Sequence, residues 1–412
     1  MSVEINNLKE SNDFLNILLD SINSAVFIVD RDRKIHSFND AFKTLFDSPE
    51  DQLLGHVFGD AIGCEYAIST GNACGNTPFC SNCVLKECTV RTFADHIPTY
   101  KRCLRREFRI GGDTIIKYFQ FSTKHLRYND QDMVVIVLDD ITEPETARIQ
   151  LDEDLKAAAE IQRSLLPASP PKPDLMDVAW HFRPCARVGG DIFNIFPLDD
   201  SHWGFYMIDV SGHGVSSAMI AVSVSQMLQP HSAILTRENR EAACGRSVIP
   251  PARVLDELNR EYPFERFESF FSITYMVIDS LSGELRYATA GHPSPLVARR
   301  DGIIEYLRTA GPVIGMDTDH AFPEGEIMLD PGDRLFIYTD GIPEYQNSEG
   351  QFFGRERMVR LLNGSRGPGG VRETVGVVME SLADFGGGVD FQDDISLLAL
   401  EYKGNTRLGT HG

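Results

Sequence analysis

The sequence predicts an α/β protein with two domains joined by a helix. The chain has 412 residues, which is too long for one ordinary hydrophobic core. Strand-like apolar runs and helical patterns occur in the first third and again in the second half, and one amphipathic segment separates the two regions. With 42% hydrophobic and 24% charged residues, the composition is that of a globular protein.

Charge and cysteine content argue against several classes of protein. The formal net charge of −21 disfavours nucleic acid or an anionic membrane as a partner, because either requires a basic face. No apolar run approaches the roughly 20 residues of a membrane-spanning helix, and the first residues lack the basic start and apolar core of a signal segment. We therefore expect a cytoplasmic protein. Five of the eight cysteines fall within 64–88, which disfavours a secreted disulfide scaffold.

Residues 10–142 have the pattern of a small α/β domain. Four segments have strand patterns: 25–30, 34–38, 115–123 and 133–138. Asn39 is placed to cap a helix that begins at Asp40. Paired strands, an Asn-x-x-Phe helix, a long variable middle and a hairpin that ends in Asp140-Ile141-Thr142 resemble a PAS domain. We expect this domain to be a sensor.

Residues 143–167 have the pattern of a helix with one apolar stripe. The stripe has spacings of three and four and consists of Ala147, Leu151, Leu155, Ala158, Ile161/Gln162 and Leu165. An ordinary helix packed on its own domain would show this pattern, and so would a short parallel coiled coil that links two chains into a homodimer. Both alternatives remain open. Pro167 to Pro173 would then be a stiff spacer.

Residues 174–402 predict a second, strand-rich domain. Its strand-like runs are 203–209, 270–279, 285–290, 295–299, 333–339 and 395–402. Its helical stretches are 215–228, 252–261, 355–362 and 371–385. Many strands with a few long helices indicate an α-β-β-α sandwich.

Four short acidic motifs are spread over this second domain. They are Arg187-Val188-Gly189-Gly190-Asp191, Asp209-Val210-Ser211-Gly212-His213-Gly214, Tyr338-Thr339-Asp340-Gly341 and Asp393-Asp394-Ile395-Ser396. Each motif alone is weak, because Asp-Gly is a common turn. We expect each aspartate to lie at the end of a buried strand. Aspartates gathered from several strand ends would form an oxygen cage for Mg²⁺ or Mn²⁺, and two such ions can activate water and neutralise a phosphate.

In this order the motifs are similar to those of the PPM family of metal-dependent serine/threonine phosphatases, in its SpoIIE/RsbU-like branch. The resemblance covers residues 160–402 and includes Glu160-Ile161-Gln162-x-x-Leu165-Leu166-Pro167 and Ala290-Gly291-His292-Pro293. It implies that two metal ions share one site. Their expected ligands are Asp209, which bridges both ions, the carbonyl of Val210, Asp340, Asp393 or Asp394 with Asp393 favoured, and Asp191 through water.

Three further residues near these motifs have open assignments. Arg187 could bind the substrate phosphate, or it could be a solvated arginine at a strand end. His213 could be a general acid, or it could be exposed only because glycines flank it. We expect His292 to support a turn. The stretch 215–221 resembles the start of the family's regulatory helix beside the active site.

A cysteine cluster lies inside the first domain. Cys64, Cys74, Cys80 and Cys83, with a Cys-x-x-Cys pair at their centre, have spacings typical of metal ligands, and Cys88 would be the spare thiol. Four thiolates suit structural Zn²⁺ or an iron–sulfur cluster. The alternatives are a reversible dithiol in Cys80 and Cys83, or reduced thiols without a role.

The resemblance implies a PAS-regulated phosphatase that acts on a phosphoserine or phosphothreonine of a STAS-domain anti-anti-sigma factor, through a water activated by two metal ions. The alternative is a non-catalytic redox or metal sensor whose phosphatase-like domain only binds a partner. The four acidic motifs are all intact, which favours the enzyme.

Overall fold

The chain divides into two compact units, residues 1–152 and 153–412. The computed structural model describes residues 19, 21–128, 130–167, 175–230, 232–238, 246–317, 319–364 and 369–404. The boundary between the units falls within helix α8 (Thr142–Ser164). Most of the proposed proline spacer lies outside the described residues. Among the helices that the structure describes, none combines the length and the apolar character needed to cross a membrane.

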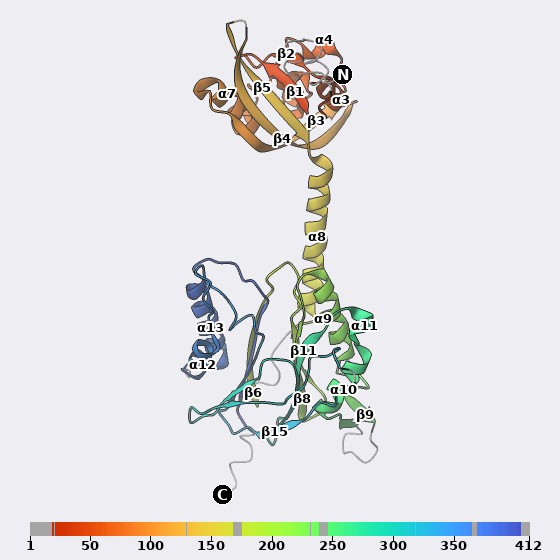
Figure 1. Cartoon of the computed structure of the whole chain (residues 1–412), viewed down its shortest axis with the longest axis vertical. Coiled ribbons are helices and arrows are strands. Elements are labelled where there is room, and N and C mark those ends of the chain that lie inside the picture. Colours follow the sequence, from red (N-terminus) through yellow and green to blue (C-terminus); the bar gives the residue numbers. More distant parts are fainter. Residues whose placement is uncertain are drawn as a thin grey trace, which may run out of the picture. The chain divides into compact units, whose positions relative to one another are not determined.

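The N-terminal unit is one antiparallel sheet with short helices (Figure 1). Its strand order is β2-β1-β5-β4-β3. The strands are β1 (Ala25–Val29), β2 (Ile35–Phe38), β3 (Thr99–Ile110), β4 (Asp113–Tyr128) and β5 (Gln131–Asp140). The helices are α3 (Asp40–Phe46), α4 (Glu50–Leu53), α5 (Phe58–Ala61), α6 (Glu65–Thr70), the 3₁₀ turn η1 (Pro78–Asn82) and α7 (Val84–Asp95). Aromatic side chains of strands and helices, among them Phe27, Phe42 and Phe119, form one buried core.

The predicted cap of α3 is confirmed. The Asn39 side chain accepts a hydrogen bond from the backbone N–H of Phe42, at 3.1 Å. The same oxygen accepts from the N–H of Val26 on β1, at 2.9 Å. A single buried amide therefore fixes the start of the helix and joins it to the sheet.

The C-terminal unit contains two five-stranded sheets. The first has the order β15-β12-β11-β8-β7 and the second β14-β13-β16-β17-β6. The strands are β6 (Met176–Arg183), β7 (Ile192–Pro197), β8 (His202–Val210), β11 (Phe271–Asp279), β12 (Glu284–Ala290), β13 (Leu296–Ala298), β14 (Ile304–Tyr306), β15 (Gly325–Met328), β16 (Arg334–Tyr338) and β17 (Ile395–Tyr402). The hairpin β9 (Thr236–Glu238) and β10 (Arg246–Val248) stands apart from both sheets.

Helices cover the outer faces of these two sheets. They are α9 (Val215–Met227), α10 (Pro251–Glu261), α11 (Phe264–Phe267), α12 (Arg355–Gly364) and α13 (Gly370–Gly386). Phe205 of the first sheet and Leu398 of the second belong to one buried cluster, so the sheets pack face to face. Separate clusters join α9 and α10 to the first sheet and α12 and α13 to the second. Figure 1 shows these helices on opposite sides of the two sheets.

Sequence patterns did not indicate strands β6 and β7. Strand β6 contains polar and half-buried residues such as His181, and β7 is interrupted by Asn194, so neither shows a long apolar run. Both become strands through pairing, β6 with β17 and β7 with β8. Tertiary pairing therefore outweighs the weak local signal.

Candidate metal centre and its cleft

Antiparallel pairing brings the acidic motifs to common sheet edges. Ile192 of β7 pairs with Ile208 of β8, which places Asp191 across from Asp209. In the second sheet, Asp340 follows β16 and Asp393 precedes β17, its antiparallel neighbour. The expectation that every aspartate ends a strand is therefore wrong for Asp191 and Asp393, which precede their strands. The start of one antiparallel strand lies beside the end of its neighbour, so the four acids still converge.

Three of these carboxylates line one cleft of about 610 Å³ in the C-terminal unit. Asp209 contributes from the first sheet, and Asp340 and Asp393 from loops of the second. Val210 and Glu344 also line the cleft. Sequence patterns did not single out Glu344, which lies four residues beyond Asp340 and whose N–H donates to the Asp340 carbonyl at 2.9 Å.

Asp191 lies outside the cleft lining, in the protein interior. Its side chain is 2% exposed. Its Oδ2 accepts hydrogen bonds from the hydroxyls of Thr339, at 2.8 Å, and Ser396, at 2.6 Å. Both donors belong to the acidic motifs, but nothing in the sequence distinguished them as partners of Asp191. They hold this carboxylate in one orientation.

Asp393 and Asp394 differ sharply in their surroundings. The Asp394 carboxylate is buried and accepts from the backbone N–H of Cys185, at 2.8 Å, and of Asp191, at 3.2 Å. Its oxygens are thus engaged in holding the loop between β6 and β7. Asp393 is exposed and lines the cleft.

Mutual repulsion and burial raise the pKa values of the acids. Burial, with the neighbouring charges of Asp340 and Asp393, raises the pKa of the Asp209 carboxyl from 3.8 to about 7. Burial and the charges of Asp209 and Asp394 hold the pKa of Asp191 well above its usual range. Burial, followed by like charge, also raises the pKa values of Asp340 and Asp393. Oxygen ligands with uncompensated negative charge fit hard divalent cations.

Two glycines permit the close packing beneath this site. A Cβ on Gly190 would lie 2.7 Å from the carbonyl oxygen of Val210, and a Cβ on Gly341 would lie 2.0 Å from that of Asp394. Any side chain at either position would displace backbone next to a candidate ligand.

Two histidines, His213 and His292, line the cleft. Of two arginines that could bind a phosphate, only Arg355 lines it. His213 is exposed. His292 is buried, its Nδ1 lies 2.7 Å from the Ser272 hydroxyl, and burial lowers its pKa to about 3, so the ring is neutral. Arg187 is exposed and is not a lining residue of the cleft. Arg355, the first residue of α12, does line it and was not singled out by sequence patterns.

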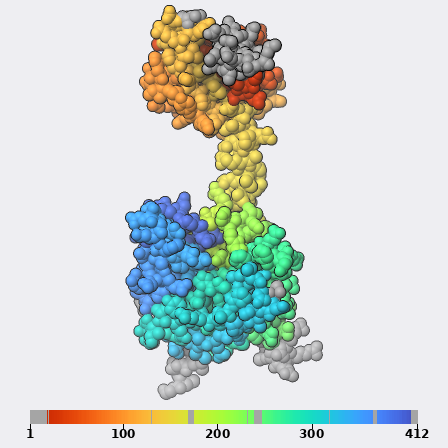
Figure 2. All heavy atoms as spheres, in the orientation of Figure 1, coloured from red at the N-terminus to blue at the C-terminus, as the bar shows by residue number. Residues whose placement is uncertain are grey.

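The last turn of α8 contacts the metal-site loop directly. Gln162 is 3% exposed and is the buried residue of this helix. Its side-chain amide bonds to Gly189, two residues before Asp191. Leu151 and Ile161 of the predicted apolar stripe are instead 59% and 62% exposed, and other side chains of α8 are also visible at the surface (Figure 2).

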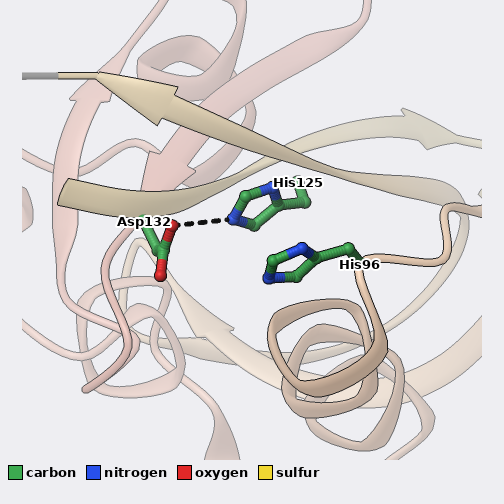
Figure 3. A group of neighbouring side chains, drawn as sticks. All are labelled: His96, His125 and Asp132. Carbon is green, nitrogen blue, oxygen red and sulfur yellow. Dashed lines mark hydrogen bonds and ion pairs between the residues drawn. The ribbon is translucent and has the colours of Figure 1, made fainter. Parts of the chain in front are cut away.

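The N-terminal unit holds two further groups of potential ligands. Cys64, Cys74, Cys80 and Cys83 line one small cavity, whereas Cys88 packs in the core. The second group is His96, His125 and Asp132 (Figure 3). Its two imidazoles stack in nearly parallel planes with ring centroids 3.9 Å apart, so their lone pairs do not converge. Asp132 is already paired with His125 and Arg31.

Both units match known protein families. Residues 199–403 match the family described as Stage II sporulation protein E, SpoIIE. Residues 13–74 match a PAS domain family. A solved structure is also similar: the SiaA-PP2C domain of Pseudomonas aeruginosa matches with a TM-score of 0.50 and 24% identity, over 62% of this chain and 98% of that one. That likeness shows the PP2C fold.

Three curated proteins are similar to part of this chain. Protein IcfG of Synechocystis sp. is 26% identical over 263 residues, 60% of this chain and 41% of that protein. Phosphoserine phosphatase RsbP of Bacillus subtilis is 27% identical over 200 residues, 47% of this chain and 46% of RsbP. Phosphoserine phosphatase RsbU of the same organism is 24% identical over 258 residues, 62% of this chain and 71% of RsbU. The matches thus span less than half the length of the first two relatives.

Proposed function

Because residues 199–403 match the SpoIIE family and residues 13–74 match a PAS domain family, we propose that this protein is a PAS-regulated, metal-dependent serine/threonine protein phosphatase. The observation that carries the proposal is the convergence of Asp209, Asp340 and Asp393 on one cleft, with Asp191 behind them. Their raised pKa values indicate negative charge that the surrounding residues leave uncompensated.

The residues fit a pair of Mn²⁺ or Mg²⁺ ions. Asp209, the carbonyl of Val210, Asp340 and Asp393 would hold them, and Asp191 would reach the second ion through water. When bound, such ions supply a water of lowered pKa and neutralise phosphate charge. Asp394 is a supporting residue in this proposal, because its oxygens accept backbone N–H groups. Thr339 and Ser396 orient Asp191.

The cleft also offers a cation for the phosphate of the substrate. Arg355 begins α12 and lines the cleft, so its guanidinium could pair with phosphate oxygens. Arg187, the residue favoured by motif position, does not line the cleft. We therefore assign substrate-phosphate binding to Arg355 in preference to Arg187.

The proposed substrate is a phosphoserine or phosphothreonine on a STAS-domain anti-anti-sigma protein. Support comes from the relatives RsbP and RsbU, both named phosphoserine phosphatases. An open cleft of about 610 Å³ suits a side chain presented on a folded protein surface. Dephosphorylation of such a protein would place this enzyme in a partner-switching pathway.

Regulation would act through α8, as a dimeric linker. The uncovered stripe residue Leu151 supports pairing with a second copy of the helix, because 59% of its surface is exposed in a single chain. Gln162 connects the same helix to the loop that carries Asp191. A shift of α8 would therefore move a metal-site residue directly.

The test is Mn²⁺-dependent release of phosphate from a phosphoserine STAS protein by the full-length chain and by Asp209→Asn. Turnover that disappears with chelator and in the variant would support the phosphatase. If wild type shows no turnover on several such substrates but both proteins bind them equally, the proposal fails and the binding-module alternative stands.

A further inference from the structure

Four cysteines line one small cavity of about 30 Å³ in the N-terminal unit. They come from separate local structures: Cys64 precedes α6, Cys74 lies in the following loop, Cys80 is in η1, and Cys83 caps α7. All four are free thiols, and Cys74 is buried. The fold therefore gathers thiols that span twenty positions of the sequence.

Apolar and aromatic side chains line the cavity beside the cysteines. Phe58, Leu104 and Phe108 form part of its wall. Tyr66 stacks on Phe79 with ring centroids 4.4 Å apart, and the Arg106 guanidinium lies 4.8 Å from the Tyr66 ring centroid. Such a wall limits access of water and oxidants to the thiols.

Polar groups around the cavity contact one of the sulfur atoms directly. The N–H of Gly75 donates to Cys80 Sγ at 3.2 Å, and the Thr77 hydroxyl lies 3.1 Å from the same sulfur. Gly59 leaves space for another sulfur, because a Cβ there would lie 2.2 Å from Cys74 Sγ. Hydrogen bonds of this kind stabilise and orient a metal-bound thiolate.

Positive charge surrounds the thiols as well. Arg106 interacts electrostatically with Cys64, Arg33 with Cys74, and Lys86 with Cys80. One guanidinium nitrogen of Arg33 is buried and, among the described residues, has no hydrogen-bond partner. A buried, unpartnered cationic nitrogen indicates that a negative group belongs beside it.

We propose that Cys64, Cys74, Cys80 and Cys83 bind a single thiophilic divalent ion, Zn²⁺ in the first instance, as a tetrahedral thiolate site in the N-terminal unit. Four thiolates around one divalent ion leave a net negative charge, which the three neighbouring cations offset. Among the described residues no three of these sulfurs lie within 4.8 Å of one another. Ion binding would therefore draw the thiols inward by side-chain rotation.

The small volume of the cavity favours a single bound ion over a metal cluster. One water molecule needs a cavity of about 10–15 Å³. The cavity of about 30 Å³ beside the four cysteines therefore has room for one ion. A cluster of several iron and sulfide atoms would need the wall to expand. The site is independent of the phosphatase cleft, so failure of either proposal leaves the other standing.

The test begins with full-length protein purified without oxygen. Elemental analysis would give its zinc, iron and acid-labile sulfide content. The metal-free, reduced protein would then be titrated with Co²⁺, whose charge-transfer absorption reports thiolate ligands. We expect about one equivalent of thiolate-bound ion per chain. Iron with stoichiometric sulfide would overturn the single-ion site in favour of a cluster.

Single substitutions identify the ligands. Cys64→Ser, Cys74→Ser, Cys80→Ser and Cys83→Ser should each abolish tight thiolate binding, while Cys88→Ser and Cys103→Ser are matched controls that should retain it. Thr77→Val should weaken binding by about 10-fold, because it removes the hydroxyl that contacts Cys80 Sγ. Circular dichroism of each metal-free variant separates ligand loss from unfolding. Absence of the thiolate band in wild type, or its persistence in all four ligand variants, would refute the proposal.

Discussion

The side-chain amide of Gln162 forms hydrogen bonds with both backbone groups of Gly189. Its Nε2 donates to the Gly189 carbonyl at 2.7 Å, and its Oε1 accepts from the Gly189 N–H at 3.1 Å. The same Nε2 lies 3.5 Å from the carbonyl oxygen of Asp191. A residue at the end of a long helix thus holds the loop that carries a candidate metal-site carboxylate.

Substitution of Gln162 should loosen that loop. In Gln162→Ala, two buried backbone groups lose their partner, so the free energy of unfolding should fall by about 2 kcal/mol and turnover should fall with it. Arg163→Ala, one residue further along and exposed, is the control. Thermal unfolding and phosphate release would be measured side by side. Equal behaviour of the two variants would contradict a structural coupling through Gln162.

Substitutions of Asp393 and Asp394 should have different effects, the first on activity and the second on stability. Asp393→Asn should abolish phosphate release but leave the metal-free protein folded, because this carboxylate lines the cleft. Asp394→Asn should lower the melting temperature, because an amide offers only one acceptor where two backbone N–H groups now donate. The measurements are activity and the metal-free unfolding curve. A stable, inactive Asp394→Asn protein would reverse the assignment.

Thr339 should act through Asp191. Thr339→Val keeps the shape of the side chain but removes the hydroxyl that donates to Asp191 Oδ2 and accepts from the Ser396 N–H. We expect a loss of about 1–3 kcal/mol in stability and weaker Mn²⁺ activation. Thr339→Ser, which keeps the hydroxyl, should restore most of both. If the valine and serine variants have the same Mn²⁺ dependence, the hydroxyl is not what positions Asp191.

The pKa of Asp209 makes the stability of the metal-free protein depend on pH. Its folded pKa is raised from 3.8 to about 7, so the folded state binds the extra proton between these values. Protonation of Asp209 therefore contributes stability that is fully present below pH 3.8 and is lost as the pH rises through about 7. Asp209→Asn should flatten this slope, and Mn²⁺ should stabilise wild type more at pH 8 than at pH 5. Parallel curves for both proteins would contradict the assignment.

The contribution of Arg355 to binding of the substrate phosphate can be separated from that of Arg187 by substitution. Arg355→Ala should lower kcat/KM by roughly 10- to 100-fold, as expected for loss of a charge-assisted hydrogen bond to phosphate. Arg355→Lys should recover part of this loss, and Arg187→Ala should have a small effect. Steady-state kinetics on the phosphoserine substrate would decide. A larger effect of Arg187→Ala would return phosphate binding to the motif arginine.

The sequence by itself indicated a chain of two units, many of the strands, the longer helices of the C-terminal unit, the Asn39 cap and the residues of the four acidic motifs. These features depend on local signals: apolar periodicity, a capping side chain, and aspartate beside glycine. The same local rules missed β6 and β7, whose strand character comes from pairing with β17 and β8. Strand β17 lies about two hundred residues beyond β6, so sequence spacing could not reveal that pairing, whereas β7 pairs with the next strand but is interrupted by Asn194.

Only the tertiary structure shows that residues of the same type, such as Asp393 and Asp394, have different surroundings. Asp393 and Asp394 are neighbours in the chain, but one faces the cleft and the other accepts backbone N–H groups. Arg355 and Glu344 enter the cleft from elements that no motif marked, and Gln162 meets Gly189 across 27 positions. Burial, charge and hydrogen bonding are properties of neighbours in space, and folding alone establishes those neighbours.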